Sequence, residues 1–71
     1  MIRVSSSKIK DLAKELNGIE ILGIHFKQEG EVKGIQVLLS TDTDDAEKAK
    51  SAVKNYLKEH YPALKIYVEV L

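Results

Sequence analysis

The chain has 71 residues and no cysteine, and its 11 basic and 11 acidic side chains cancel to a formal net charge of zero. A domain of this size buries only about 60% of the surface that its unfolded chain exposes, so its core is small. Without cysteine there is no disulfide, no thiolate nucleophile and no thiolate metal site. The zero net charge gives no overall attraction to nucleic acid or to an anionic membrane, although it is compatible with a local charged patch.

No apolar stretch approaches the roughly 20 residues that a membrane-spanning helix needs. The opening segment, MIRVSSSKIK, also lacks the apolar core of a signal peptide. We therefore expect one soluble, cytoplasmic domain over residues 1–71, without membrane insertion.

The first clear element is a helix over residues 7–16. Its apolar residues follow the i, i+3, i+4, i+7 spacing of a helix with one buried face, and they are Ile9, Leu12, Ala13 and Leu16. Serine hydroxyls at residues 5–7 are suited to cap its start, and Asn17-Gly18 is suited to end it. Ahead of this helix, the segment IRV at residues 2–4 is a candidate short strand.

Residues 19–28 alternate with a period of two, which predicts a strand. This alternation puts Leu22, Ile24 and Phe26 on one face and Ile21, Gly23, His25 and Lys27 on the other. Glu29-Gly30-Glu31 supplies a turn, because glycine takes the positive φ of a tight hairpin. Residues 32–40 alternate again, with Ile35, Val37 and Leu39 on one side. The two segments predict a hairpin with one apolar face.

A second helix is predicted within residues 40–60, where an apolar stripe recurs at helical spacing: Ala46, Ala49, Val53, Tyr56, Leu57 and His60. Pro62 prevents this helix from continuing. Residues 61–71 then predict a strand with Leu64, Ile66, Val68 and Val70 inward and Lys65, Tyr67 and Glu69 outward.

The predicted order is αββαβ, or βαββαβ if residues 2–4 form a strand. Both orders fit an α+β fold, the two-layer ferredoxin-like plait, in which two helices cover one face of an antiparallel sheet. The other sheet face stays open and carries Ile21, His25, Leu38 and Tyr67. Such a face is either solvated or paired with a partner, most simply with a second copy of the same sheet. These four residues are our candidate homodimer interface.

Motifs of catalysis are missing, since the chain has no phosphate loop and no dinucleotide fingerprint. Ser7 and Lys10 have a Ser-x-x-Lys spacing, but serines ahead of an amphipathic segment are what a helix start requires. An alternative is that this helix start binds an anion such as phosphate, with Ser6, Ser7, Lys8 and Lys10. We expect no enzyme activity.

The acidic run TDTDD at residues 41–45 resembles the start of a calcium loop, but Ala46 and Glu47 stand where an oxygen ligand and a glycine belong. We interpret this run as the cap of the second helix, with carboxylates that complement the helix dipole. His25 and His60 lie on different elements, without the close spacing of zinc ligands. His25 is therefore interpreted as an outward strand residue, and no cofactor is required.

Residues 16–70 resemble the cytosolic C-terminal dimerisation domain of cation diffusion facilitator transporters. The matching segments are GIEILGIHF, GIQVLLSTD, DAEKAKSAVKNYLKEHYP and KIYVEV. The resemblance implies a compact αββαβ unit that pairs through its sheet. It also implies a zinc site, for which His25, Glu47 and Glu69 are the remaining donors. Leu38 and Tyr67 occupy positions where members of the family carry histidine, so most of the nitrogen ligands are missing.

Three functions stay open, and we favour a non-enzymatic module of self-association or regulation. The second is an RNA- or anion-binding domain. Sheets that bind RNA carry two or three stacking aromatics and a basic surface, whereas only Tyr67 is well placed here, which disfavours nucleic acid. The third is an engineered ferredoxin-like protein without evolved function, because each local signal agrees with the global pattern.

Overall fold

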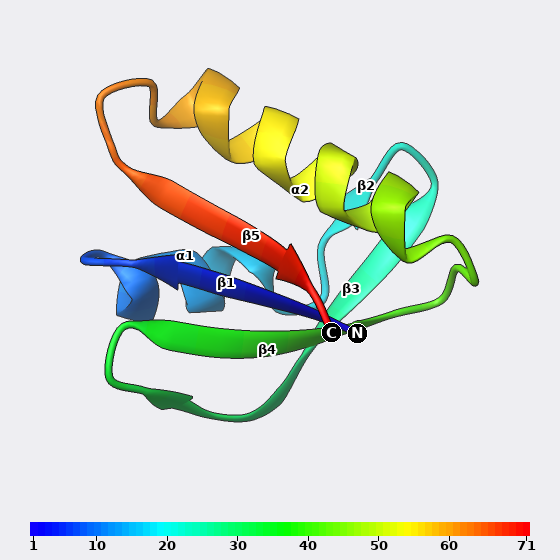
Figure 1. Ribbon diagram of the computed structural model, residues 1–71, viewed down its shortest axis with the longest axis horizontal. Helices are drawn as coiled ribbons and strands as arrows, with labels where there is room; N and C mark the ends of the chain where they lie inside the picture. Colours follow the sequence, from blue (N-terminus) through cyan, green and yellow to red (C-terminus); the bar gives the residue numbers. More distant parts are fainter.

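The structure, a computed structural model, describes all 71 residues and contains two helices and five strands (Figure 1). In chain order the elements are β1 (Ile2–Ser6), α1 (Ile9–Leu16), β2 (Glu20–Ile21), β3 (Ile24–Lys33), β4 (Gln36–Thr41), α2 (Ala46–His60) and β5 (Ile66–Val70). The strands form one sheet in the order β2-β3-β4-β1-β5, and every neighbouring pair is antiparallel. The two termini lie side by side, where the N–H of Leu71 donates to the carbonyl of Met1.

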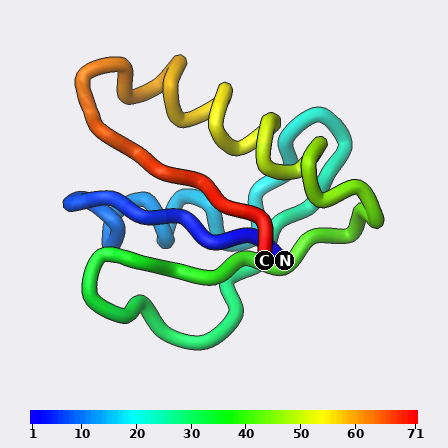
Figure 2. The backbone as a smooth tube through the Cα atoms, in the orientation of Figure 1, coloured from blue at the N-terminus to red at the C-terminus, as the bar shows by residue number.

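The predicted two-layer ferredoxin-like plait is wrong. The predicted N-terminal strand is present, but β2 adds one strand to the predicted βαββαβ order, and the five-stranded sheet is curled into a half-barrel around the core (Figure 2). The long strand β3 has an irregular register against β4 between Glu29 and Lys33. Such irregularities bend a strand and increase its twist, which accounts for the curl.

The segment predicted as one strand over residues 19–28 is divided by a tight turn. Leu22 and Gly23 both have positive φ, at 52° and 80°. Two consecutive positive φ values are typical of a type I′ turn, which folds β2 back onto β3. This turn changes the faces of the flanking residues: Ile21 is only 8% exposed and joins the core, whereas Leu22 is 78% exposed.

The core confirms most of the predicted inward residues. All four apolar residues of α1 are buried, as are Phe26, Val37 and Leu39 of the central hairpin. Ile66 and Val70 pack against this cluster together with buried Val68. The exceptions are Leu22 in the β2–β3 turn, which is 78% exposed, and Ile35, which follows Gly34 in the β3–β4 turn and is 56% exposed.

The two helices begin differently. The side chain of Asp45 accepts the N–H of Lys48 at 3.1 Å, so the predicted capping role of the acidic run is confirmed at the start of α2. By contrast, α1 begins two residues later than predicted and its cap residue, Lys8, has no side-chain cap. The hydroxyl of Ser6 instead accepts the N–H of Lys8 at 3.2 Å, ahead of the helix. Neither helix is long and apolar enough to cross a bilayer.

Candidate anion-binding site

The four residues of the predicted homodimer interface do not form one patch. Ile21 is buried in the core, and His25 lies where β3 begins. Leu38 and Tyr67 share the open face of the sheet, but β1 runs between them, since Arg3 lies opposite Leu38 and Ser5 lies opposite Tyr67.

This open face is mainly polar along its central row. The antiparallel registers align Glu29, Leu38, Arg3 and Glu69 across four strands. Arg3 and Glu69 form an ion pair at 2.8 Å. The half-buried Leu38 is therefore flanked by charged side chains rather than by further apolar residues.

His25 is held between two carboxylates at one end of the molecule. Its Nδ1 lies 2.8 Å from Asp42 and its Nε2 lies 3.1 Å from Glu20. Asp42 also accepts the backbone N–H of His25 at 3.0 Å. The hydrogen bond with Asp42, followed by the charge of Glu20, raises the pKa of His25 above 6.5. The pKa of Asp42 is lowered by its hydrogen bonds with the backbone and then the ring of His25.

The predicted zinc donors are not assembled around His25. Glu69 is paired with Arg3, and Glu47 lies in the first turn of α2. The two carboxylates that do surround His25 face different ring nitrogens. A metal ion bound to one nitrogen of His25 would therefore have only one of these carboxylates beside it. No group of three or more His, Asp or Glu side chains is arranged to hold a metal ion.

The predicted anion site at the start of α1 is only partly available. Ser6 is buried and its hydroxyl is engaged with the backbone of Lys8. Ser7, Lys8 and Lys10 are exposed. Asp11, in the first turn of this helix, lines the same surface hollow as Lys8, so this hollow carries balanced charge.

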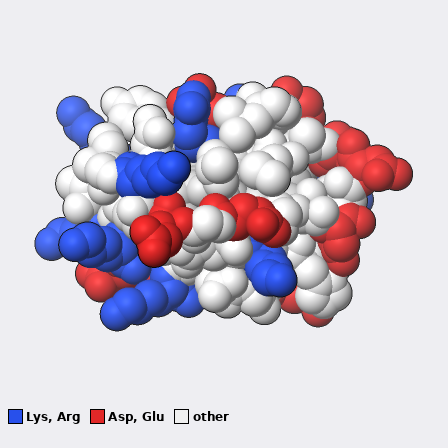
Figure 3. Space-filling view, turned by 90° about the horizontal axis from the view of Figure 1, so that it is seen from below, with Lys and Arg blue, Asp and Glu red and all other residues white.

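Opposite charges gather at opposite ends of the molecule, although the net charge is zero. The registers bring the end of β1 beside the starts of β4 and β5. Lys8, Lys33, Lys58 and Lys65 lie on segments at or near this end. Glu20 and the acidic loop between β4 and α2 lie at the other end, joined through His25. Figure 3 shows most of the Lys and Arg atoms toward one end and many Asp and Glu atoms toward the other, with further acidic atoms in the middle of this face and beside the basic ones.

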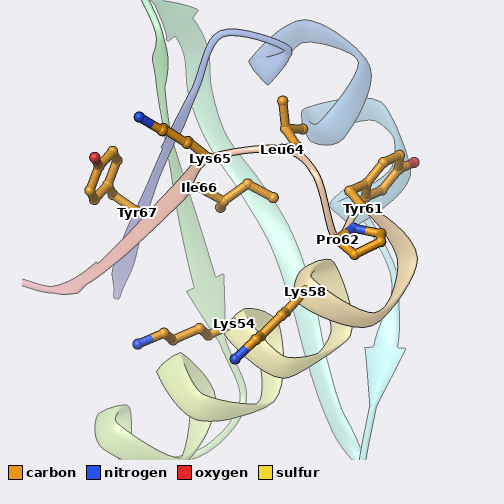
Figure 4. A pocket seen from close by; sticks show the side chains of 8 residues that line it. All are labelled: Lys54, Lys58, Tyr61, Pro62, Leu64, Lys65, Ile66 and Tyr67. Carbon is orange, nitrogen blue, oxygen red and sulfur yellow. The ribbon is translucent and has the colours of Figure 1, made fainter.

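A hollow of about 400 Å³ opens at the basic end, between the second half of α2 and the start of β5 (Figure 4). We name it the lysine hollow, and its lining residues are Lys54, Lys58, Tyr61, Pro62, Leu64, Lys65, Ile66 and Tyr67. It contains three basic side chains and no acidic one. None of the three lysines forms an ion pair: no carboxylate oxygen lies within 4.0 Å of their ammonium groups. The basic partners in the ion pairs of the chain are Arg3 and His25.

The three lysines come from α2 and from the segment just before β5. Lys54 and Lys58 are one helical turn apart on α2 and therefore neighbours on its surface. Pro62 follows the end of the helix, and the turn that contains it brings Lys65 back alongside them. Figure 4 shows Lys54 and Lys58 extending from α2, Lys65 and Tyr67 on the β5 side, and Ile66 between them.

One wall of the lysine hollow is fixed to α1 through Glu15. The Tyr61 hydroxyl donates to this carboxylate at 2.5 Å, and the Tyr56 hydroxyl donates to it at 2.8 Å. These two hydrogen bonds, with Tyr61 the larger effect, lower the pKa of Glu15. The carboxylate is thus ionised at neutral pH and holds α1, α2 and the turn before β5 together.

The sequence pattern did not single out this site. Lys54 and Lys58 resemble an ordinary solvated helix face, and Lys65 resembles an outward strand residue. The only local signal is that the three lysines flank the single proline, at which the chain must reverse.

Comparison with family models, with curated proteins and with solved structures finds no match to this chain. The resemblance to the dimerisation domain of cation diffusion facilitators therefore stays a prediction.

Proposed function

We propose that this chain is a non-enzymatic binding module that takes an anionic partner in the lysine hollow. The observation that carries the proposal is the combination of three lysines, no acidic side chain and an apolar floor in one concave site. Of the three hollows described, this is the one without an acidic lining residue. The second contains Glu29 and Glu31 beside Arg3 and Lys33, and the third contains Asp11 beside Lys8.

The lining favours a partner that carries several anionic groups along a chain. Lysine is a flexible point charge and lacks the planar fork with which arginine binds a single phosphate from two sides. Ile66 lies between the lysines, and Pro62 and Leu64 add apolar surface to the same hollow (Figure 4). A partner that alternates carboxylates with apolar groups would satisfy both properties, because apolar contact partly dehydrates the ion pairs and strengthens them.

Self-association through the open sheet face is the weaker proposal. It is supported by Tyr67, which is 64% exposed, and by half-buried Leu38. Against it stand the burial of Ile21 and the charged row on either side of Leu38. Interfaces between identical sheets usually have a more apolar centre than this row provides.

A triple substitution of the lining lysines tests the proposal. We expect the variant Lys54→Gln, Lys58→Gln, Lys65→Gln to bind a nine-residue peptide of alternating Glu and Val about tenfold more weakly than the unsubstituted chain. Each exposed ion pair contributes roughly 0.2–1 kcal/mol, and about 1.4 kcal/mol in total corresponds to tenfold. Isothermal titration calorimetry at low salt measures the affinity.

The matched control is Lys14→Gln, Lys27→Gln, Lys48→Gln, which removes the same charge at exposed positions outside the lysine hollow. It should bind the peptide within about twofold of the unsubstituted chain, since only the overall charge has changed. Equal weakening in both variants would show non-specific attraction to net charge and would contradict the proposal. Absence of binding to the unsubstituted chain would contradict it as well.

A further inference from the structure

The outer edge of β5 is unpaired along its whole length. Because β5 is the last strand of the sheet, it has a hydrogen-bonding neighbour only on the side of β1. In an antiparallel pair, hydrogen-bonded and non-bonded residue pairs alternate. The N–H of Leu71 donates to the carbonyl of Met1, so the register assigns the other bonded pairs to Arg3 with Glu69 and Ser5 with Tyr67.

The backbone groups of Ile66, Val68 and Val70 therefore point away from β1, toward the free edge. No other backbone hydrogen bond of the chain reaches these three residues from that side. Three N–H groups and three carbonyls thus form a ready template for one more strand.

The lysine hollow lies beside this same edge. Figure 1 shows α2 running along β5, and the two elements are in contact. Lys54 and Lys58 extend from the helix, whereas Tyr67 belongs to the face of the sheet that the helices leave open, and Lys65, just before β5, lies on the same side as Tyr67. Successive side chains of a strand point to opposite faces. A strand added to β5 would thus direct one set of side chains toward Lys54 and Lys58 and the other toward Lys65.

We propose that the anionic partner is an extended acidic segment of another protein, which adds to the free edge of β5 as a sixth strand of the sheet. This inference rests on the proposed function and specifies how the partner is held. Main-chain hydrogen bonds would supply affinity, and carboxylates opposite the three lysines would supply specificity, as in other cases of strand addition. A segment of about five residues, roughly 17 Å long, matches the length of β5.

A second copy of this chain fits the edge less well. Two β5 strands paired about Tyr67 would place Lys65 opposite Glu69 of the other copy. Glu69 is already paired with Arg3, however, and each copy would bring Lys54 and Lys58 to the same seam. Lysines at a strand edge oppose pairing between two basic edges. An acidic segment meets no such repulsion.

Amide hydrogen exchange with the Glu-Val peptide tests the inference. In the free protein, the amides of Ile66, Val68 and Val70 should exchange as unprotected amides, whereas those of Tyr67 and Glu69 should already be protected by β1. With free peptide at about nine times Kd, exchange of the first three amides should slow about tenfold, because about nine-tenths of the protein is then bound. New protection at every second amide of β5 would show that the peptide forms backbone hydrogen bonds with the free edge.

A twin peptide with every backbone amide N-methylated keeps the charges and cannot donate main-chain hydrogen bonds. We expect it to bind at least about tenfold more weakly. Equal affinity of the two peptides, with no new protection at Ile66, Val68 and Val70, would overturn strand addition and leave the anion-binding proposal standing. Failure of both peptides to bind would overturn both proposals. Protection of the three amides without peptide, together with a dimer in sedimentation equilibrium, would show that a second copy occupies the edge and would also overturn the inference.

Discussion

His25 connects the turn between β2 and β3 with the acidic loop before α2, through Glu20 and Asp42. Because its pKa is higher in the folded chain than the ordinary value of 6.5, protonation stabilises the fold. This contribution is fully present below pH 6.5 and is lost as the pH rises through the raised pKa of the folded state. We expect the melting temperature of the unsubstituted chain to fall with pH over this range, relative to that of His25→Gln. Thermal unfolding followed by circular dichroism measures both profiles.

Asp42 titrates in the opposite sense to His25, and its effect on stability appears at lower pH. Its pKa is lowered in the folded chain, so its contribution is present above pH 3.8 and is lost only as the pH falls through the lowered value. The carboxylate therefore stays ionised while His25 titrates. Parallel melting profiles for the unsubstituted chain and His25→Gln above pH 6.5 would contradict the role assigned to His25.

The turn between β2 and β3 is the element in which local preference and observed conformation disagree. Leu22 adopts a φ of 52° while largely exposed, although left-handed backbone costs ordinary residues roughly 1–2 kcal/mol. Asn-Gly is the preferred pair in a type I′ turn. We expect Leu22→Asn to raise the free energy of unfolding by about 1 kcal/mol, measured by urea denaturation.

A β-branched residue at the same position provides the control, because it tolerates positive φ least. Leu22→Val should lower the free energy of unfolding. If the effect of Leu22→Asn came only from removing an exposed apolar side chain, the smaller valine would raise the free energy of unfolding as well. Stabilisation by both substitutions would therefore show that the exposed side chain, and not the backbone, carries the effect.

The molecule as a whole has a small core and therefore a small stability margin. Sixteen buried apolar residues form one cluster, and Leu57 of α2 is fully buried within it. Truncation of such a residue to alanine costs about 2–5 kcal/mol, while small domains have total stabilities near the lower end of 5–15 kcal/mol. We expect Leu57→Ala to lower the free energy of unfolding by about 2–5 kcal/mol, which leaves at most about 3 kcal/mol, as urea denaturation would show.

Leu71 at the exposed C-terminus serves as the matched control. Leu71→Ala should change the free energy of unfolding by less than about 0.5 kcal/mol. A cost below about 1 kcal/mol for Leu57→Ala would mean that the cluster is not the main source of stability.

Local pattern in the sequence determined a large part of the fold. Helical spacing identified the buried face of α1, and the acidic run was correctly interpreted as the cap of α2. These predictions succeed because neighbouring residues alone decide which side chains share a helix face and which groups satisfy a helix end. The alternation in the last segment likewise identified Ile66, Val68 and Val70 as inward residues.

Tertiary structure alone decided the rest. The sequence alternation places Ile21 on the open face, because it runs without a break through Leu22 and Gly23. Only the packing of β2 onto β3 requires a turn at these two residues. The half-barrel, the separation of charge and the lysine hollow depend on which distant segments become neighbours. Lys54 lies on α2 and Lys65 lies eleven positions later, just before β5, so no single helix or strand relates them. They meet because β5 must return along α2 to cover the core.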